Sequence, residues 1–137
     1  MNLIIADAGP LVAYLKQDDQ HHEWAARCFR EFRDPLVTCD SALSEALFLL
    51  RDVHNGRERL FTLLERRAVI PAFSLPEQIP QVLALMRRYA DVPMSLADAC
   101  LVRMAELGEE ASVFTTDSDF RRYRRHRRGT IPLLFPD

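Results

Sequence analysis

The chain opens with Leu3-Ile4-Ile5-Ala6-Asp7-Ala8-Gly9-Pro10, its most informative segment. The apolar run is short, rich in branched residues and stopped by Gly9-Pro10, which predicts a strand buried on both faces of a sheet. Asp7 directly follows that strand. Because ligands bind at the carboxyl ends of strands in open α/β sheets, Asp7 marks a candidate site. The alternative is that Asp7 only caps the next helix, with Pro10 in its first turn.

Length and composition limit the classes to which the chain can belong. With 137 residues, 48% of them hydrophobic, we expect a single domain, residues 1–137, with a substantial core. The formal net charge of -2 neither indicates nor excludes a nucleic-acid partner. The three cysteines share no metal-ligand spacing, as is typical of a reducing compartment. Neither a charged leader nor a membrane-length apolar run is apparent, so we expect a soluble, cytoplasmic protein.

Strand patterns alternate with helix patterns along the rest of the chain. Further strands are predicted at 36–39, 69–73, 112–116 and 131–134. Helices are predicted at 10–15, 20–33, 57–67, 75–89 and 96–107, and another begins at the caps Asp40 and Ser41 and runs to about Asp52. Gly129-Thr130 is expected only to join elements. The alternation indicates an α/β fold, a three-layer α/β/α sandwich with a central, mostly parallel sheet.

Glu45 occupies an unusual position on one of these helices. Its helical neighbours Ala42, Phe48 and Leu49 are apolar, so the pattern places the Glu45 carboxylate in the buried sector. An unpaired charge is costly there. The alternative to a functional site is a buried ion pair with an arginine.

Asp98 and Asp117 are two further candidates. Asp98 lies on the apolar stripe of its helix, although Ser95, three residues earlier, makes a capping box an equally good explanation. Asp117 follows a second buried strand, as Asp7 follows the first. A helix cap does not explain why two strands end on acids.

We hypothesise that four carboxylates converge, those of Asp7, Glu45, Asp98 and Asp117. They come from two strand ends and the first turns of two helices, regions that meet at the carboxyl edge of such a sheet. Like charges ~4 Å apart repel by about 4 kcal/mol per pair at an effective dielectric constant near 20, so the cluster requires a cation. Carboxylates without His or Cys favour Mg²⁺ or Mn²⁺ over zinc. These ions take substrate phosphates as further ligands, which indicates phosphoryl chemistry.

Arginines are concentrated near the end of the chain. Lys16 is the only lysine, and six of the 17 arginines fall between Arg121 and Arg128. Arg forks bind phosphate bidentately and a Tyr can stack on a base, so this run is the candidate for holding an RNA backbone. The candidate RNA-binding residues in it are Arg121, Arg122, Tyr123, Arg124 and Arg125. The alternative is a solvated helix face or arginines paired with surface acids.

Four motifs follow one another in the chain: Asp7-Ala8-Gly9-Pro10-Leu11, Ser44-Glu45-Ala46, Ser95-Leu96-Ala97-Asp98-Ala99 and Thr115-Thr116-Asp117-Ser118-Asp119-Phe120. In this order and setting they resemble the PIN-domain ribonucleases, most closely the VapC-type toxins of bacterial toxin–antitoxin pairs. The resemblance covers essentially the whole chain.

The resemblance implies an endoribonuclease dependent on Mg²⁺ or Mn²⁺, often a homodimer, that a small antitoxin inhibits by inserting into the active-site groove. It assigns Asp7, Glu45, Asp98 and Asp117 to the family's catalytic, metal-binding acidic quartet. It also makes Asp119 a fifth candidate metal ligand. Thr116 would orient a metal-bound water or a phosphate of the RNA.

Two other kinds of function stay open. One is another Mg²⁺-dependent phosphoryl hydrolase, such as a haloacid-dehalogenase-like phosphatase, but that family has a second Asp where this chain has Gly9 and needs a later Lys. A phosphoacceptor receiver domain lacks the same features. The other is a PIN-fold module that binds RNA or a protein without cleaving, against which the retention of all four acids argues.

Overall fold

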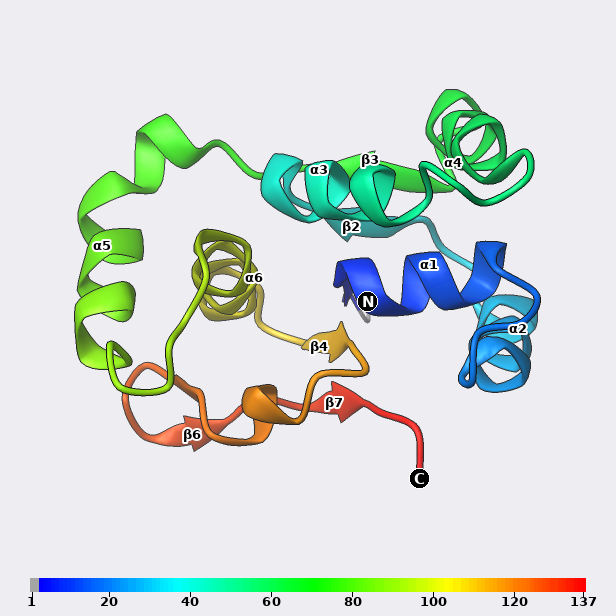
Figure 1. Ribbon diagram of the computed structural model, residues 1–137. Coiled ribbons are helices and arrows are strands. Elements are labelled where there is room, and N and C mark those ends of the chain that lie inside the picture. Colours follow the sequence, from blue (N-terminus) through cyan, green and yellow to red (C-terminus); the bar gives the residue numbers. More distant parts are fainter. Residues whose placement is uncertain (1–2) are drawn as a thin grey trace.

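The computed structural model describes residues 3–137 and contains a five-stranded sheet in the order β3-β2-β1-β4-β7 (Figure 1). Its strands are β1 (Leu3–Ala6), β2 (Leu36–Thr38), β3 (Val69–Pro71), β4 (Ala111–Phe114) and β7 (Leu133–Leu134). Every pairing in this sheet is parallel, and β1 is central: Ile5 lies opposite Val37 on one side and Val113 on the other. The opening segment is therefore the middle strand of the sheet, as its apolar run predicts.

Six helices and two 3₁₀ turns surround the sheet in the described part of the chain. They are α1 (Ala8–Leu15), α2 (His22–Glu31), α3 (Asp40–Leu49), α4 (Gly56–Glu65), η1 (Leu75–Gln78), α5 (Ile79–Arg88), α6 (Leu96–Leu107) and η2 (Ser118–Arg121). The helix expected at 75–89 begins as the turn η1, with Pro80 at the start of α5. The expected caps Asp40 and Ser41 lie inside α3, and Cys39 occupies the N-cap position.

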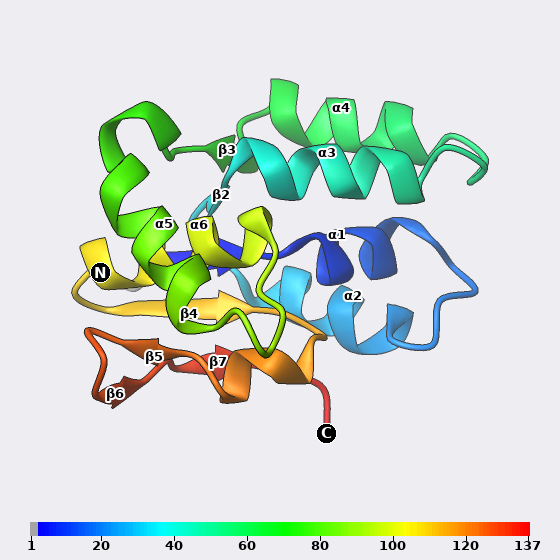
Figure 2. The same cartoon turned by 60° about the vertical axis from the view of Figure 1, so that its left-hand side comes forward.

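The two faces of the sheet are covered by different helices, because successive strand residues point to opposite faces. Ala6 and Phe114 pack in a core with side chains of α1, α2, α3 and α4, whereas Ile5 and Val113 pack in a second core with α5 and α6. Figures 1 and 2 show α5 and α6 on one side of the sheet and α1 and α2 on the other. The three-layer α/β/α prediction is confirmed.

The arginine-rich segment is not the helix face that was considered as the alternative to an RNA-binding run, and Gly129-Thr130 is not only a connection. After η2 the chain forms an antiparallel hairpin, β5 (Arg124–Arg125) with β6 (Gly129–Thr130), rather than a helix face and a simple connection. The chain reverses through His126 and Arg127, whose φ angles of 51° and 69° are left-handed. The backbone N–H of His126 donates to Glu106 Oε2 at 2.8 Å, so α6 holds the hairpin in place.

None of the helices among residues 3–137 combines the length and the apolar composition needed to cross a lipid bilayer.

Candidate active site

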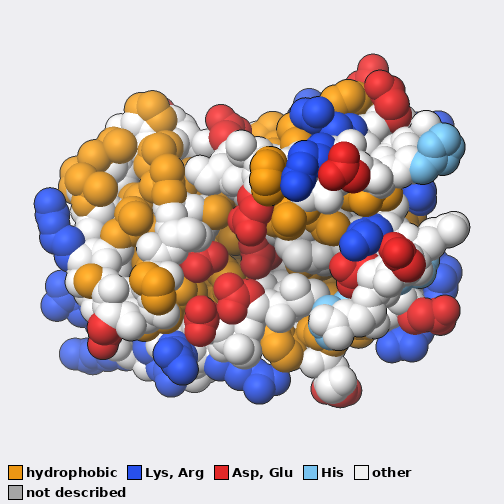
Figure 3. Space-filling view, in the orientation of Figure 1, with side chains coloured by type: hydrophobic (Ala, Val, Ile, Leu, Met, Phe, Trp, Pro, Cys, Tyr) orange, Lys and Arg blue, Asp and Glu red, His pale blue; other side chains and the backbone are white. Residues whose placement is uncertain are grey.

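A cavity of about 410 Å³ opens where β1 and β4 end. It is lined by Asp7, Gly9, Glu45, Leu49, Pro93, Ser95, Asp98, Thr116, Asp117 and Asp119. Figure 3 shows acidic side chains gathered in the middle of one face of the molecule, with Lys and Arg along its edges. Five carboxylates thus face one hollow, and no described Lys or Arg is part of its lining.

Asp7 is the most deeply buried acid of the cavity. It leaves the central strand β1, and its side chain is 7% exposed. Oδ1 accepts a hydrogen bond from the backbone N–H of Ala8 and Oδ2 accepts one from the Thr115 hydroxyl, both at 2.8 Å. Asp7 therefore caps α1, as the structural alternative expected, and also lines the cavity. One role does not exclude the other.

The Thr115 hydroxyl links the two strand ends that carry acids. It donates to Asp7 and accepts a 3.0 Å hydrogen bond from the backbone N–H of Asp117, and the residue is fully buried. Sequence reasoning missed Thr115, which it treated as part of a strand. The available signal was its position: Thr115 ends an apolar run and lies two residues before Asp117. Its neighbour Thr116 lines the cavity.

Gly9 allows α1 to approach the loop after β4. A Cβ at this position would collide with Oγ1 of Thr116. Past Thr116, the Asp117 side chain accepts a 2.9 Å hydrogen bond from the backbone N–H of Asp119 and so caps η2. The motif around Asp117 is thus folded into a fixed loop beside the first turn of α1.

Asp98 is anchored by its own helix and by Tyr123. The capping box is present: Asp98 N–H donates to Ser95 Oγ at 3.0 Å, and Ser95 N–H donates to Asp98 Oδ2. The Tyr123 hydroxyl donates to the same oxygen at 3.0 Å. Because Tyr123 is fully buried, its ring cannot stack on a base in this conformation, contrary to the role predicted for it. Tyr123 orients a carboxylate instead.

Glu45 does not lie in the buried sector, so that prediction is wrong. The buried residues of α3 are Ala42, Leu43 and Ala46, a stripe with helical spacing that Glu45 does not join. The residue is exposed and lies in the second turn of α3, not the first. No ion pair joins it to an arginine within residues 3–137. Its apolar neighbours Phe48 and Leu49 are themselves 61% and 45% exposed.

Burial and mutual repulsion disfavour the charged forms of these acids. Burial raises the pKa of Asp7 from its ordinary value of 3.8 to about 7, against the two hydrogen bonds, and Asp98 and Glu45 add to the rise. Burial also raises the pKa of Asp98, as does the nearby charge of Asp117. The pKa of Glu45, although the residue is exposed, is raised by the partial desolvation of its carboxyl group and then by Asp98 and Asp117. In the absence of a cation the site therefore tends to hold protons, because no Lys or Arg lines the cavity to balance the ionised acids.

This donor set fits Mg²⁺ or Mn²⁺ better than a softer ion, since every candidate ligand atom is a carboxylate oxygen. The acids do not form a closed cage: over residues 3–137, no three His, Cys, Asp or Glu side chains lie close enough to hold one ion. Mg²⁺ commonly binds through one or two carboxylates and keeps several waters. The arrangement suits that open form of coordination.

The arginine run lies outside the cavity lining. Arg121 and Arg122 are exposed, and the Arg121 guanidinium stacks on the Phe135 ring at 4.4 Å. Arg124 has a structural role: its Nη1 donates to the carbonyls of Arg121 and Tyr123, and its backbone N–H donates to the Tyr89 hydroxyl. Arg125 is half-buried in β5. Arg121 and Arg122 are thus the members of the predicted set that are open to a ligand.

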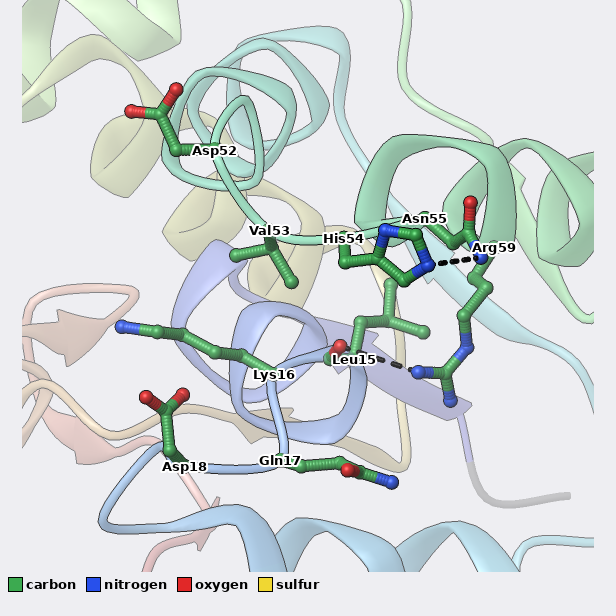
Figure 4. A pocket seen from close by; sticks show the side chains of 9 residues that line it. All are labelled: Leu15, Lys16, Gln17, Asp18, Asp52, Val53, His54, Asn55 and Arg59. Atoms are coloured by element: carbon green, nitrogen blue, oxygen red, sulfur yellow. Dashed lines mark hydrogen bonds between the residues drawn. The ribbon is translucent and has the colours of Figure 1, made fainter.

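A larger cavity, of about 550 Å³, lies between the end of α1 and the loop that joins α3 to α4 (Figure 4). Lys16, Asp18, Asp52 and Arg59 line it, so charges of both signs alternate there. Arg59 donates to the Leu15 carbonyl at 3.4 Å. None of the candidate metal ligands lines this cavity.

Comparison with known proteins bears on fold and family. No curated protein sequence matches the chain. Its structure is similar to the crystal structure of Mycobacterium tuberculosis VapC20, which is described as a toxin that cleaves the sarcin-ricin loop. The TM-score is 0.74 and the sequence identity is 18%, and the match covers 85% of this chain and 91% of that one. The family model of the PIN domain matches residues 4–126. That match includes every acid of the cavity, and the chain belongs to the PIN domain family.

Proposed function

We propose that this protein is a metal-dependent endoribonuclease and the toxin of a type II toxin–antitoxin pair. The observation that carries the proposal is the cavity lined by five carboxylates and no described Lys or Arg, inside a PIN domain. The likeness to a toxin that cleaves an RNA loop supports RNA as the substrate. Such an enzyme would act in the cytoplasm.

The ion, Mg²⁺ or Mn²⁺, would be held by Asp7, Glu45, Asp98 and Asp117, with Asp119 as a fifth candidate ligand. When bound, such an ion lowers the pKa of a water for attack on the scissile phosphodiester and neutralises charge on the phosphoryl oxygens. The chain contributes orientation. Thr115 and the Ala8 N–H fix the Asp7 carboxylate, and Ser95 and Tyr123 fix that of Asp98. Partners of this kind commonly matter to metal affinity nearly as much as the ligands do.

RNA binding is assigned to groups around the cavity. Thr116 lines it and would orient a phosphate oxygen. Arg121, the last residue of η2, and Arg122, its C-cap, would bind backbone phosphates outside the cavity. Arg124 and Arg125 would act by shaping the hairpin.

An antitoxin fits the chemistry at the edge of the cavity. Leu49 lines the cavity and is largely exposed, and Phe48 beside it is the most exposed of the large apolar side chains described. Apolar side chains in solvent next to a negatively charged hollow suit a segment that combines apolar residues with a basic one. Such a segment would cover the site and neutralise its charge.

We further propose a homodimer. Ile79 and Leu83, four residues apart on α5, are 41% and 40% exposed. Figure 3 shows apolar side chains gathered over the part of the surface that α5 occupies in Figure 1. Light scattering on the purified protein would detect the dimer, and Leu83→Lys should convert it to monomer. A monomeric wild type would refute this part of the proposal.

Cleavage of a mixed, end-labelled RNA pool tests the nuclease proposal. The purified protein is incubated with Mg²⁺, with Mn²⁺ or with EDTA, beside Asp7→Asn and a matched control, Asp34→Asn. Asp34 is exposed and does not line the cavity. We expect metal-dependent cutting by the wild type and the control, and none by Asp7→Asn while it stays folded by circular dichroism.

Equal cutting by Asp7→Asn, or cutting that persists in EDTA, would refute the mechanism and indicate a contaminating nuclease. RNA binding without cutting in any metal would favour the alternative, a PIN-fold binding module. Release of phosphate from a small phosphomonoester without RNA cleavage would favour another phosphoryl hydrolase.

A further inference from the structure

Cys39 and Cys100 lie far apart in the chain and meet in the core. Cys39 occupies the N-cap position of α3, and Cys100 lies in the second turn of α6, roughly 60 residues later. Each is 1% exposed, and both belong to the same apolar cluster. The two thiols lie close enough for each to shift the pKa of the other. Neither is part of the acidic cavity lining.

A separate cavity of about 340 Å³ lies beside the pair. The two cysteines line it together with Asp40, Ser41, Phe73, Ser74, Leu75 and Pro76. A water molecule takes about 30 Å³ in the liquid, so this space admits a small polar reagent such as hydrogen peroxide. A small oxidant can therefore enter a cavity that both cysteines line, although each residue is only 1% exposed.

We propose that Cys39 and Cys100 are a modification site that hydrogen peroxide converts into an intramolecular disulfide. Peroxide oxidises one thiol to a sulfenic acid and leaves as one water. The second thiol then attacks that sulfur, the S–S bond forms, and a second water departs. Two thiols lose two electrons and two protons, and one peroxide becomes two waters.

Cys39 is the thiol that reacts first. Cys39 lies at the N-terminus of α3, where the thiol of Cys100 and then the backbone N–H groups of Ala42 and Ser41 lower the pKa of its own thiol. Such groups stabilise the thiolate, which is the form that attacks peroxide. Cys100 is the resolving thiol because it contacts Cys39.

The disulfide would join the start of α3 to α6, the helices that carry Glu45 and Asp98. A cross-link that closes a loop of this length should raise the Tm by roughly 10 °C. A second consequence rests on the proposed nuclease function: a fixed distance between α3 and α6 would hinder closure of the acids on a metal, and RNA cleavage would fall roughly tenfold.

The test maps disulfides in the native protein after treatment with dilute hydrogen peroxide. Trypsin places the three cysteines in separate peptides, residues 28–30, 34–51 and 89–103. We expect mass spectrometry to find 34–51 joined to 89–103 with the loss of two hydrogens, and dithiothreitol to reverse both the link and the rise in Tm. Free thiols at Cys39 and Cys100 after treatment, or a link through the 28–30 peptide, would overturn the proposal.

Two variants sharpen the test. Cys28→Ser, which leaves the pair intact, should form the same link and show the same rise in Tm. Cys100→Ser should show neither the link nor the rise in Tm. An equal rise in the Tm of this variant would also overturn the proposal. If the variant fails to fold, the disulfide map of the wild-type protein still decides. Because the link is read from peptides, its presence does not depend on RNA cleavage. A protein that forms the link but cuts no RNA would refute the proposed function alone.

Discussion

Asp7 and Glu45 line the same cavity, yet the chain holds them in opposite ways. Asp7 is buried at the end of the central strand, with both oxygens in hydrogen bonds. Glu45 is exposed on α3, and no hydrogen bond or ion pair links its side chain to another residue within 3–137. The site therefore has a fixed side, formed by Asp7 and the similarly anchored Asp98, and a free side, formed by Glu45.

The difference shows how one site can combine carboxylates in fixed positions with a carboxylate that ionises and moves more easily. A buried carboxylate is costly to ionise. The raised pKa of Asp7 is the result of that cost. Fixed carboxylates reduce the reorganisation needed to bind an ion, whereas an exposed one can move toward substrate or water. We expect the fixed side to determine metal binding and the free side to be more tolerant of change.

Exchange of each carboxylate for its amide should give the largest effects. Asp7→Asn should lower the rate of metal-dependent RNA cleavage by about 1,000-fold, since a fixed ligand accounts for several kcal/mol of transition-state stabilisation. Glu45→Gln should lower it by roughly 100-fold, because water can replace an exposed carboxylate in part. Single-turnover cleavage measures both, and a greater loss in Glu45→Gln would reverse the comparison.

The stability of the metal-free protein should fall as pH rises from about 4 to about 7. In this range folded Asp7 keeps a proton that the unfolded chain has released, because its pKa is raised from 3.8 to about 7. Its stabilising contribution is complete below about pH 4 and is lost as pH rises through 7, by up to about 4 kcal/mol. The raised pKa values of Glu45 and Asp98 act in the same direction.

Urea unfolding in EDTA at several pH values measures this loss. Asp7→Asn should flatten the dependence and be the more stable protein at pH 8, while Asp34→Asn should follow the wild type. Added Mg²⁺ should stabilise the wild type but not Asp7→Asn. Parallel pH profiles for wild type and Asp7→Asn would contradict the assignment.

Thr115→Val should affect both stability and activity. The change keeps the shape of the side chain but removes the hydroxyl that donates to Asp7 and accepts from the Asp117 N–H. We expect the free energy of unfolding to fall by about 1–3 kcal/mol. The rate of RNA cleavage should fall by about 10- to 100-fold. Thr38→Val is the matched control. Its buried hydroxyl donates to the Ala6 carbonyl and touches no carboxylate, so stability should fall while activity persists. Similar activity losses in both variants would indicate a purely structural role.

Tyr123→Phe should have a smaller effect, about tenfold on cleavage, because it removes one hydrogen bond to Asp98. RNA affinity should not change, since the ring is buried. Tyr89→Phe is the control: the Tyr89 ring packs edge-on against Tyr123, but its hydroxyl accepts from the Arg124 N–H. A loss of RNA affinity in Tyr123→Phe alone would restore the stacking role predicted from the sequence.

The smallest effect is expected for the exposed arginines. A double variant, Arg121→Gln with Arg122→Gln, should weaken RNA binding a few-fold and lower its salt slope by about 1.4, as for two phosphates of a single strand. Binding is measured in the Asp7→Asn background, to prevent cleavage. Arg57→Gln with Arg66→Gln is the control, since both arginines are exposed, one in the first turn of α4 and the other at its C-cap. An unchanged slope would remove Arg121 and Arg122 from the RNA interface.

Much of the fold followed from local pattern. The five strands of the main sheet lie within a residue or two of their predicted ranges, because apolar runs between turn residues mark strands buried on both faces. The β5–β6 hairpin was missed since nothing in Arg124–Thr130 resembles a turn signal apart from Gly129. Contact with Glu106 on α6 holds that hairpin, and no local pattern reports such a contact.

The candidate site was only partly predictable. The five acids proposed as ligands line one cavity, because strand ends and capping positions place side chains at the same edge of the sheet. The expected burial of Glu45 was wrong, since an apolar neighbour on a helix can lie in solvent, as Phe48 does. The functions of Thr115 and Tyr123 depend on partners 108 and 25 residues away.

The sequence by itself determined the class of fold, the central strand and the acids that follow two strands of the sheet. These features depend on hydrophobic periodicity and turn residues, which act over a few positions of the chain. Only the tertiary structure decided which acids are fixed and which are free. It also decided that Tyr123 supports a carboxylate and that Cys39 meets Cys100. Burial, pKa and hydrogen bonding depend on what the rest of the chain packs around a side chain, and that environment exists only after the layers have assembled.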